Sequence, residues 1–258
     1  MSSPAYLWEV VRAMAQETRL LDINPGLDRN SLALRFAAER RVQIRDVLTQ
    51  EAAANVHRVL AQETQWGLAW QAAQEGPHNV PEPELRRLPP DRARRMQQQL
   101  MTAMAGHDYA FAYSHYPMVH AYLEAWAPGG PHEALLELIN DQPFLDLVRE
   151  VTGLPQLSKA DAQATLFAPG QFLATHDDSH MAEGWRVAYV LGMCMEDWRP
   201  EWGGYLQFFD EEGDVEAGWK PRFNSLNLFL VPQRHAVTFV PPFAPVARYA
   251  ITGWFRDL

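Results

Sequence analysis

The sequence contains a single cysteine, Cys194, among 258 residues. One cysteine cannot form an intramolecular disulfide, and it excludes a thiolate-rich metal site. Such sparse use of cysteine is typical of a reducing compartment, so we predict a cytoplasmic protein. The N-terminus has no basic start followed by an apolar run, and no apolar stretch approaches the length of a membrane span. We therefore expect neither a secretory signal nor a membrane partner.

Basic residues are also scarce. Lys and Arg number 22 against 32 Asp and Glu, which gives a net charge of −10. Binding to a phosphate backbone requires clustered cations, so we predict no direct contact with nucleic acid. An acidic surface favours a basic partner, although the same charge also serves solubility. The 47% of hydrophobic and 21% of charged residues are ordinary for a globular chain and argue against wholesale disorder.

Residues 1–160 are mostly helical in pattern. Thr49 is a candidate N-cap, and Pro143 is expected to split the last helical stretch in two, because an interior proline removes a hydrogen bond. Residues 76–90 are rich in proline and polar side chains and predict a loop, whereas the alternation of Val42–Val47 predicts a strand. The expected helices are Ala5–Arg19, Ser31–Arg40, Gln50–Glu63, Arg92–Met104 and Pro131–Thr152.

Short β-rich runs separated by turn residues follow in residues 161–258. Their close spacing indicates an antiparallel sandwich or barrel. The isolated strand near residues 42–47 needs a sheet to join, so we expect one domain over 1–258 with a mainly β core and supporting N-terminal helices. The expected strands are Ala164–Phe167, Phe172–His176, Arg186–Met193, Tyr205–Phe209, Ser225–Val231, Ala236–Val240 and Arg248–Phe255.

The segment His176-Asp177-Asp178 is the first candidate for chemistry. On a strand, residues i and i+2 share a face, so His176 and Asp178 can converge on one ion. The rival pairing of His176 with His180, as on a metalloprotease helix, lacks the glutamate of that motif and falls after a predicted strand, so we reject it.

Downstream residues complete a recognisable set. His235 stands on a later strand and Arg248 on the next. Two imidazoles and one carboxylate leave three adjacent octahedral positions open, which suits non-haem Fe(II) rather than tetrahedral zinc. A buried arginine near such a site is costly unless it meets an anion, and a dicarboxylate cosubstrate supplies one.

With these residues in place, the chain resembles the prolyl-hydroxylase branch of the 2-oxoglutarate and Fe(II)-dependent oxygenases, closest to ribosomal-protein prolyl hydroxylases and their bacterial relatives. The resemblance covers roughly residues 160–258. It is carried by residues 167–178, 186–191, 197–198, 202–206, 221–224, 235–237 and 248–255.

The resemblance implies a double-stranded β-helix in which His176, Asp178 and His235 bind Fe(II). Arg248 would hold the distal carboxylate of 2-oxoglutarate, with a hydrogen bond from Thr252. Such an enzyme consumes O2, releases succinate and CO2, and is often supported by ascorbate. The expected substrate is a prolyl residue of a protein or peptide. The family often has cosubstrate-contacting tyrosines at two positions that are matched here by Phe167 and Met193.

Three further residues are candidates for substrate contact: Arg186, Tyr113 and Tyr116. The last two lie in the aromatic segment 109–118, which is expected either to pack over the sheet or to form a lid. The acidic segment Asp210–Asp214 predicts a solvated hairpin turn that could also attract a basic peptide. Two alternatives stay open: hydroxylation of a free amino acid or small metabolite, and a non-catalytic module that senses a ligand or binds a partner.

Overall fold

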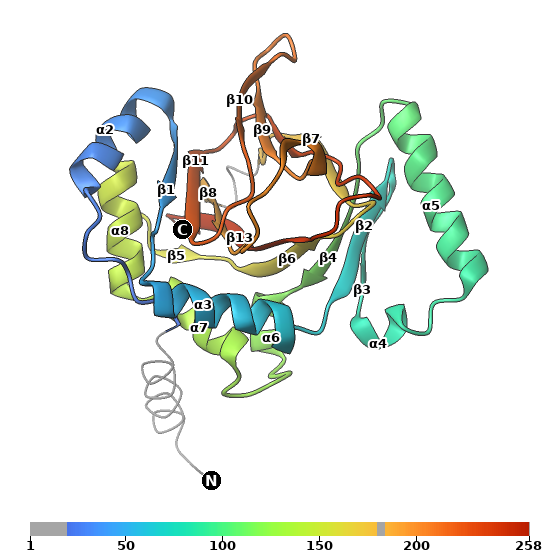
Figure 1. Cartoon of the computed structure of the whole chain (residues 1–258), viewed down its shortest axis with the longest axis horizontal. Coiled ribbons are helices and arrows are strands. Elements are labelled where there is room, and N and C mark those ends of the chain that lie inside the picture. The colour runs from blue at the N-terminus through green and yellow to red at the C-terminus, as the bar shows by residue number, and fades with distance from the viewer. Residues whose placement is uncertain (1–19, 180–183, 258) are drawn as a thin grey trace.

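A computed structural model describes residues 20–179 and 184–257, so the predicted helix Ala5–Arg19 lies outside the described residues. The described strands form one sheet in the order β1-β11-β8-β13-β6-β4-β7-β12-β9-β10, with β2, β3 and β5 attached at its sides. This sheet curls into a nearly closed barrel, with helices along its outside (Figure 1). The predicted double-stranded β-helix with supporting helices is confirmed.

One layer of the barrel contains the isolated N-terminal strand. Its five strands are β1 (Arg41–Arg45), β11 (Ser225–Leu230), β8 (Trp185–Gly192), β13 (Arg248–Arg256) and β6 (Gln163–Phe167). β1 pairs antiparallel with β11 along its whole length, although about 180 residues separate the two strands. The expected strand near residues 42–47 thus joins the C-terminal sheet, which supports our proposal of one domain.

The second layer faces the first across the barrel. It consists of β7 (Phe172–His176), β12 (His235–Val237), β9 (Leu206–Phe209) and β10 (Val215–Trp219). The predicted turn between β9 and β10 is confirmed: Asp210 Oδ1 accepts hydrogen bonds from the backbone N–H groups of Glu212 and Asp214. Gly213 has φ 94°, a left-handed conformation that glycine adopts without strain.

Three strands in the first half are absent from the sequence-based predictions: β2 (Gly67–Ala72), β3 (Glu75–Val80) and β4 (Ala110–Tyr116). The predicted loop at 76–90 is wrong, because it contains most of β3 and the helix α4 (Glu82–Leu85). Pro77 does not prevent β3, since that strand pairs only with β2. The aromatic segment 109–118 is not a lid, because β4 pairs with β2, β6 and β7 inside the sheet.

The predicted helices begin and end close to their expected bounds. They are α2 (Arg29–Glu39), α3 (Gln50–Arg58) with the π-helix η1 (Val59–Glu63), α5 (Pro90–Ala105), α7 (Pro131–Ile139) and α8 (Gln142–Thr152). Two further elements were not predicted: the helix α6 (Met118–Leu123) and the short 3-10 turn η3 (Pro200–Trp202). The Thr49 hydroxyl accepts from the N–H of Ala52, which confirms the predicted cap. Pro143 lies in the first turn of α8, so the predicted split is confirmed.

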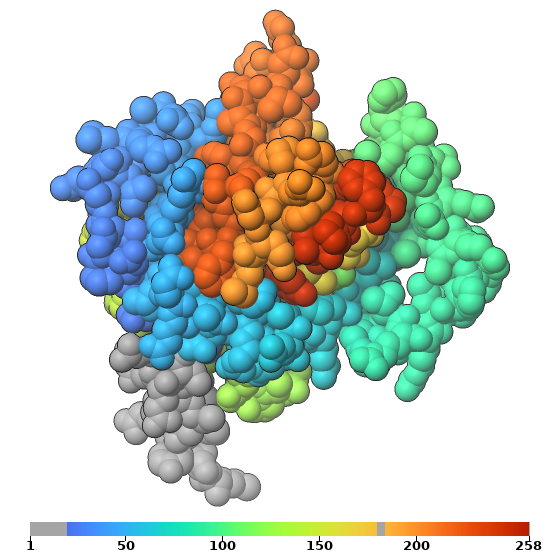
Figure 2. All heavy atoms as spheres, in the orientation of Figure 1, coloured from blue at the N-terminus to red at the C-terminus, as the bar shows by residue number. Residues whose placement is uncertain are grey.

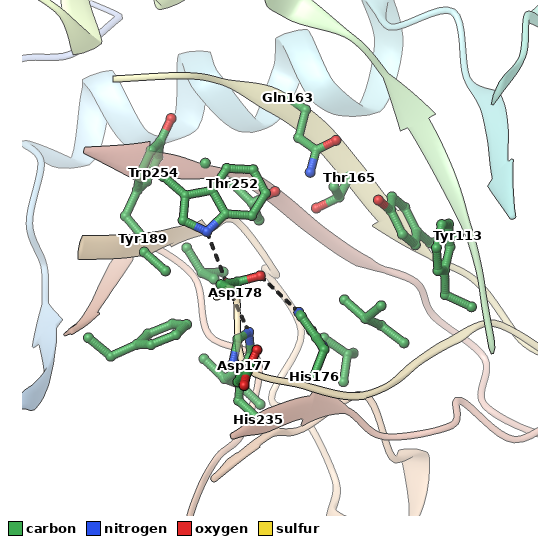
Figure 3. Close-up of a pocket in the computed structure, with 18 of the residues that line it drawn as sticks. Tyr113, Gln163, Thr165, His176, Asp177, Asp178, Tyr189, His235, Thr252 and Trp254 are labelled. Atoms are coloured by element: carbon green, nitrogen blue, oxygen red, sulfur yellow. Dashed lines mark hydrogen bonds and ion pairs between the residues drawn. The ribbon is translucent and has the colours of Figure 1, made fainter. Parts of the chain in front are cut away.

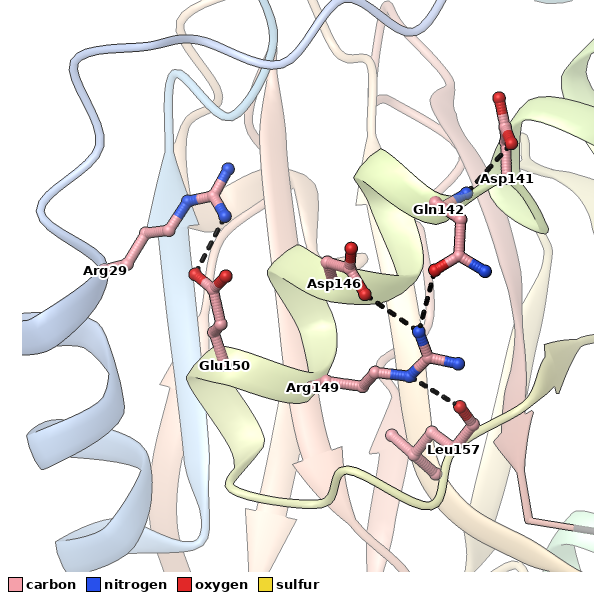
Figure 4. Close-up of polar contacts among 7 residues, drawn as sticks. All are labelled: Arg29, Asp141, Gln142, Asp146, Arg149, Glu150 and Leu157. Atoms are coloured by element: carbon pink, nitrogen blue, oxygen red, sulfur yellow. Dashed lines mark hydrogen bonds and ion pairs between the residues drawn. The ribbon is translucent and has the colours of Figure 1, made fainter.

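The main apolar core lies between the helices and the outer face of the first layer. On β8, Val187, Tyr189 and Leu191 join this core, whereas Ala188 and Val190 face the barrel interior. Outside it, polar contacts tie α8 to its surroundings: Arg29 pairs with Glu150 of α8 at 2.8 Å (Figure 4). No helix in the described part of the chain is long and apolar enough to cross a bilayer.

Candidate metal and cosubstrate site

The barrel interior contains a cavity of about 490 Å³ between the two layers. Its lining includes His176, the last residue of β7, and His235, the first residue of β12. These two residues are register partners on adjacent strands, and their ring centroids are 4.1 Å apart. The sheet register therefore brings together two histidines that are 59 positions apart in the chain.

Asp178 joins the histidines from a turn. β7 ends at His176, and Asp178 has φ 58°, so the expectation that both residues share one strand face is wrong. The left-handed turn nevertheless directs the carboxylate back to the imidazoles (Figure 3). Asp178 Oδ1 lies 3.4 Å from His176 Nε2, and Oδ2 lies 3.5 Å from His235 Nε2. The ligating atoms of all three residues lie within 4.8 Å of one another.

Backbone carbonyl groups orient the two histidine rings so that their Nε2 atoms face the carboxylate of Asp178. His176 Nδ1 lies 2.9 Å from the carbonyl oxygen of Ala174, and His235 Nδ1 lies 2.7 Å from that of Gln233. A carbonyl only accepts, so each Nδ1 donates, and in the neutral form of such a ring Nε2 carries the lone pair. Burial, with a smaller effect of His176, lowers the pKa of His235 to about 4, so this ring is neutral at pH 7. Three acceptors thus converge, an arrangement that a cation stabilises.

Trp254 is a supporting residue that the sequence reasoning missed. Its Nε1 donates to Asp178 Oδ2 at 2.9 Å, and its ring stacks on Trp185 at a centroid distance of 3.9 Å. The sequence could have indicated this role. Alternate residues of a strand share one face, so Trp254 lies on the same face of β13 as Arg248 and Thr252. Arg248, Thr252 and Trp254 all line the cavity.

Arg248 places a positive charge in the cavity wall. Its side chain is 4% exposed, and its guanidinium lies 5.2 Å from the ring centroid of Phe167. Burial lowers the pKa of Arg248 to about 10, so it stays protonated at neutral pH. Within residues 20–179 and 184–257, no carboxylate pairs with it. A buried unpaired cation beside a cavity favours an anionic ligand there.

Further polar groups come from β13 itself and from β6 and β4, the next two strands of the sheet. Thr252, Gln163, Thr165 and Tyr113 line the cavity (Figure 3). Burial raises the pKa of Tyr113 to about 12, and a hydrogen bond with Gln163 opposes that rise. The rings of Tyr113 and Phe167 stack at a centroid distance of 5.2 Å. Tyr113 on β4 therefore brings a tyrosine hydroxyl to the strand next to Phe167, the residue that stands where the family often has a tyrosine. No sequence motif includes Gln163 or Thr165, so neither was predicted as a site residue.

The remaining predicted residues lie elsewhere. Met193 is fully buried in the core under the helices, so its lack of a hydroxyl does not affect the cavity. Tyr116 packs in that same core, with its ring against His132. Arg186 Nε donates to Asp257 at 2.6 Å outside the cavity lining. Substrate contact by Tyr116 or Arg186 stays a prediction that no cavity contact supports.

Comparisons with known proteins agree with this geometry. A family model described as the 2OG-Fe(II) oxygenase superfamily matches residues 162–256. No curated protein matches the chain by sequence.

Solved structures show a shared fold at low identity. A prolyl hydroxylase from Trichoplax adhaerens, solved with a peptide fragment of the hypoxia inducible factor oxygen degradation domain, is 14% identical with a TM-score of 0.56; the match covers 100% of this chain and 94% of that one. A Pseudomonas putida prolyl-4-hydroxylase is 17% identical with a TM-score of 0.51, covering 92% and 97%. A 2OG-Fe(II) oxygenase family oxidoreductase from Burkholderia pseudomallei is 13% identical with a TM-score of 0.55, covering 92% and 94%.

Proposed function

We propose that this chain, which belongs to the 2OG-Fe(II) oxygenase superfamily over residues 162–256, hydroxylates a prolyl residue of a protein or peptide. It is a dioxygenase that uses Fe(II), 2-oxoglutarate and O2. The main support for this proposal is that three converging acceptor atoms and a buried unpaired arginine line the same cavity. A metal and a dicarboxylate together satisfy both features.

The roles of the residues follow from their chemistry. His176, Asp178 and His235 hold Fe(II) through their converging acceptor atoms. Arg248 binds the distal carboxylate of 2-oxoglutarate, and the hydroxyl of Thr252, on the same face of β13, adds a hydrogen bond. When bound, iron and 2-oxoglutarate together supply the oxidation that hydroxylates a C–H bond, with release of succinate and CO2.

The surrounding residues hold and shield these groups. Each Nδ1–H donates to a backbone carbonyl, which keeps both Nε2 atoms available as ligands. Trp254 restrains the carboxylate of Asp178 through Oδ2. Apolar side chains, among them Leu206 and Phe229, line the remaining wall and limit water in the cavity. In such surroundings the charge of Arg248 acts more strongly on a bound carboxylate than it would in water.

The rim of the cavity supports a macromolecular substrate. Tyr109, Asp177 and Ser179 line the cavity and are exposed to solvent. A peptide that lies across these residues can insert one side chain towards His176, whose ring centroid is 6.1 Å from that of Tyr109. The Trichoplax adhaerens prolyl hydroxylase was solved with a peptide fragment, which supports the same substrate class here. The exposed carboxylate of Asp177 favours a basic flanking residue in the peptide.

The test is incubation of the protein with Fe(II), ascorbate, 2-oxoglutarate and the host proteome, followed by peptide mass spectrometry. We expect succinate together with a gain of one oxygen atom localised to proline. Hydroxylation localised to another residue type would overturn the prolyl assignment. Failure to turn over 2-oxoglutarate with any protein or metabolite would overturn the enzyme assignment.

A free amino acid or small metabolite is the second candidate substrate. The cavity volume of about 490 Å³ is large enough for a small substrate beside the cosubstrate. The two candidates differ at the rim, because only a peptide extends past it. Replacing Tyr109 with alanine should therefore raise the KM of a peptide substrate, while a metabolite held inside the cavity should lose less affinity.

A further inference from the structure

A second cavity, of about 730 Å³, lies where β1 and α2 approach the β10 edge of the barrel. Arg41 of β1 pairs with Glu216 of β10 at 2.9 Å, so the first and last strands of the sheet order come together here. In the space-filling view, α2 and β1 (blue) adjoin the hairpin of β9 and β10 (orange), which projects from this face (Figure 2). Among the described residues, this groove and the iron cavity share no lining side chain.

Four positively charged side chains line this groove, although the net charge of the chain is −10. They come from separate segments: Arg35 from α2, Arg45 from β1, and Lys220 and Arg222 from the segment between β10 and β11. No carboxylate is among the lining residues that the structure describes. The groove is therefore a local basic site on an acidic protein.

Few of these charges are neutralised by the protein itself. Lys220 pairs with Asp197, a carboxylate whose side chain is 98% exposed and thus strongly screened by water. In the described part of the chain, Arg35, Arg45 and Arg222 have no ion-pair partner. Burial and the neighbouring charge of Arg45 both lower the pKa of Arg222, so the two guanidinium groups repel each other. Such repulsion is relieved when an anion binds between them.

The protein also orients one of these guanidinium groups. Gln43 is 9% exposed and donates to Asn227, while its Oε1 accepts from Arg222 Nε at 2.9 Å. A buried amide held on both sides fixes the direction of Arg222 and leaves its terminal N–H groups available. Tyr205 and Trp219 add aromatic walls to the groove, and the ring of Trp219 is itself held against Phe208 at 5.0 Å.

We propose that this groove binds a phosphate-bearing ligand with at least two negative charges. A phosphate group offers up to two charges and three acceptor oxygens, and guanidinium groups bind it through paired hydrogen bonds. Three unpaired guanidinium groups match a ligand with adjacent phosphates better than a single carboxylate, which could neutralise only one of them. We expect the phosphates to belong to a free polyphosphate-like molecule, because the net charge of −10 opposes binding of a nucleic acid backbone.

Calorimetric titration of the full chain without added iron tests the proposal, because phosphate then cannot act by chelating the metal. The two probes are inorganic tripolyphosphate and a short single-stranded oligonucleotide. The probe with the lower Kd identifies the source of the phosphate. We expect saturable binding that weakens as salt rises. The pair Arg35→Gln and Arg45→Gln should raise the Kd about tenfold, and both side chains are exposed, so the fold should be retained.

The matched control is the pair Arg87→Gln and Arg94→Gln, which removes the same charge from exposed positions outside the groove. It should leave the Kd unchanged. The proposal is overturned if neither probe binds saturably to the unaltered chain, or if the control pair weakens binding as much as the groove pair. Neither outcome affects the oxygenase assignment, since the iron cavity is lined by other residues.

Discussion

The indole of Trp254 donates a hydrogen bond to the carboxylate of Asp178, a proposed metal ligand, so Trp254→Phe removes one donor while keeping an aromatic ring. In the unaltered protein this bond, of 2.9 Å, restrains Oδ2 and holds the carboxylate towards both histidines. Without it, the carboxylate can rotate away from the position at which the three ligands converge. We therefore expect weaker Fe(II) binding by a protein that is still folded.

Two independent magnitudes agree on the size of the effect. A hydrogen bond to a charged group contributes about 1.5–3 kcal/mol. Loss of an outer hydrogen bond to a metal ligand typically costs about 10- to 100-fold in metal affinity, which corresponds to about 1.4–2.7 kcal/mol. Because Asp178 is only 9% exposed, water replaces the indole poorly, so we expect the upper half of this range.

The assay is anaerobic titration of Fe(II) in the presence of 2-oxoglutarate, followed through the metal-to-ligand charge-transfer absorption band. Trp185→Phe is the matched control, because it alters the same ring stack and leaves the donor of Trp254 in place. The control should bind Fe(II) within about threefold of the unaltered protein, since a phenyl ring can still stack on Trp254 and the Trp254 donor is kept. Equal weakening by both variants, or unchanged binding by Trp254→Phe, would refute the reasoning.

Three further predictions concern the cosubstrate and the fold. Arg248→Gln should weaken 2-oxoglutarate binding roughly 10- to 100-fold, because the buried cation in the cavity is lost; an unchanged Kd in the same titration would contradict this. Tyr113→Phe should raise the KM for 2-oxoglutarate about 3- to 10-fold and leave the KM for peptide unchanged, since Tyr113 stacks on Phe167 and lines the cavity that contains Arg248; the reverse pattern would assign Tyr113 to the substrate. Asn224→Ala should lower the free energy of unfolding by about 2–4 kcal/mol in urea titration, because Asn224 satisfies both the N–H and the C=O of Leu48; a smaller loss would mean that water replaces the amide.

The β-helix core was predictable because its strands are short, regular and separated by strong turn residues. The bounds of β7 agree with the sequence-based range; those of β11 and β13 differ from it by one residue at one end, and those of β8 by one residue at both ends. β2, β3 and β4 were not predicted, since their residues do not alternate cleanly. β4 shows why: it carries aromatic side chains at 111 and 113 on the cavity face, and small residues at 110 and 112 on the other. Its alternation is one of size, which polarity patterns do not detect.

The candidate site was partly readable for a different reason. The donor types of His176, Asp178 and His235 are specific enough to indicate a metal, but their convergence depends on a left-handed turn at Asp178. No residue pattern marks that turn, because aspartate adopts positive φ only occasionally. Net charge was equally uninformative about the basic groove, since a total over the whole chain does not report where Arg35, Arg45 and Arg222 converge.

We propose that three acceptor atoms and one buried arginine bind Fe(II) and 2-oxoglutarate in a single cavity. The most direct test of this proposal is the anaerobic charge-transfer band, measured for the unaltered protein and for His235→Ala. We expect a band that requires both Fe(II) and 2-oxoglutarate, and its loss when His235 is replaced. A protein that shows no band with both present, or a variant that retains the full band, would contradict it.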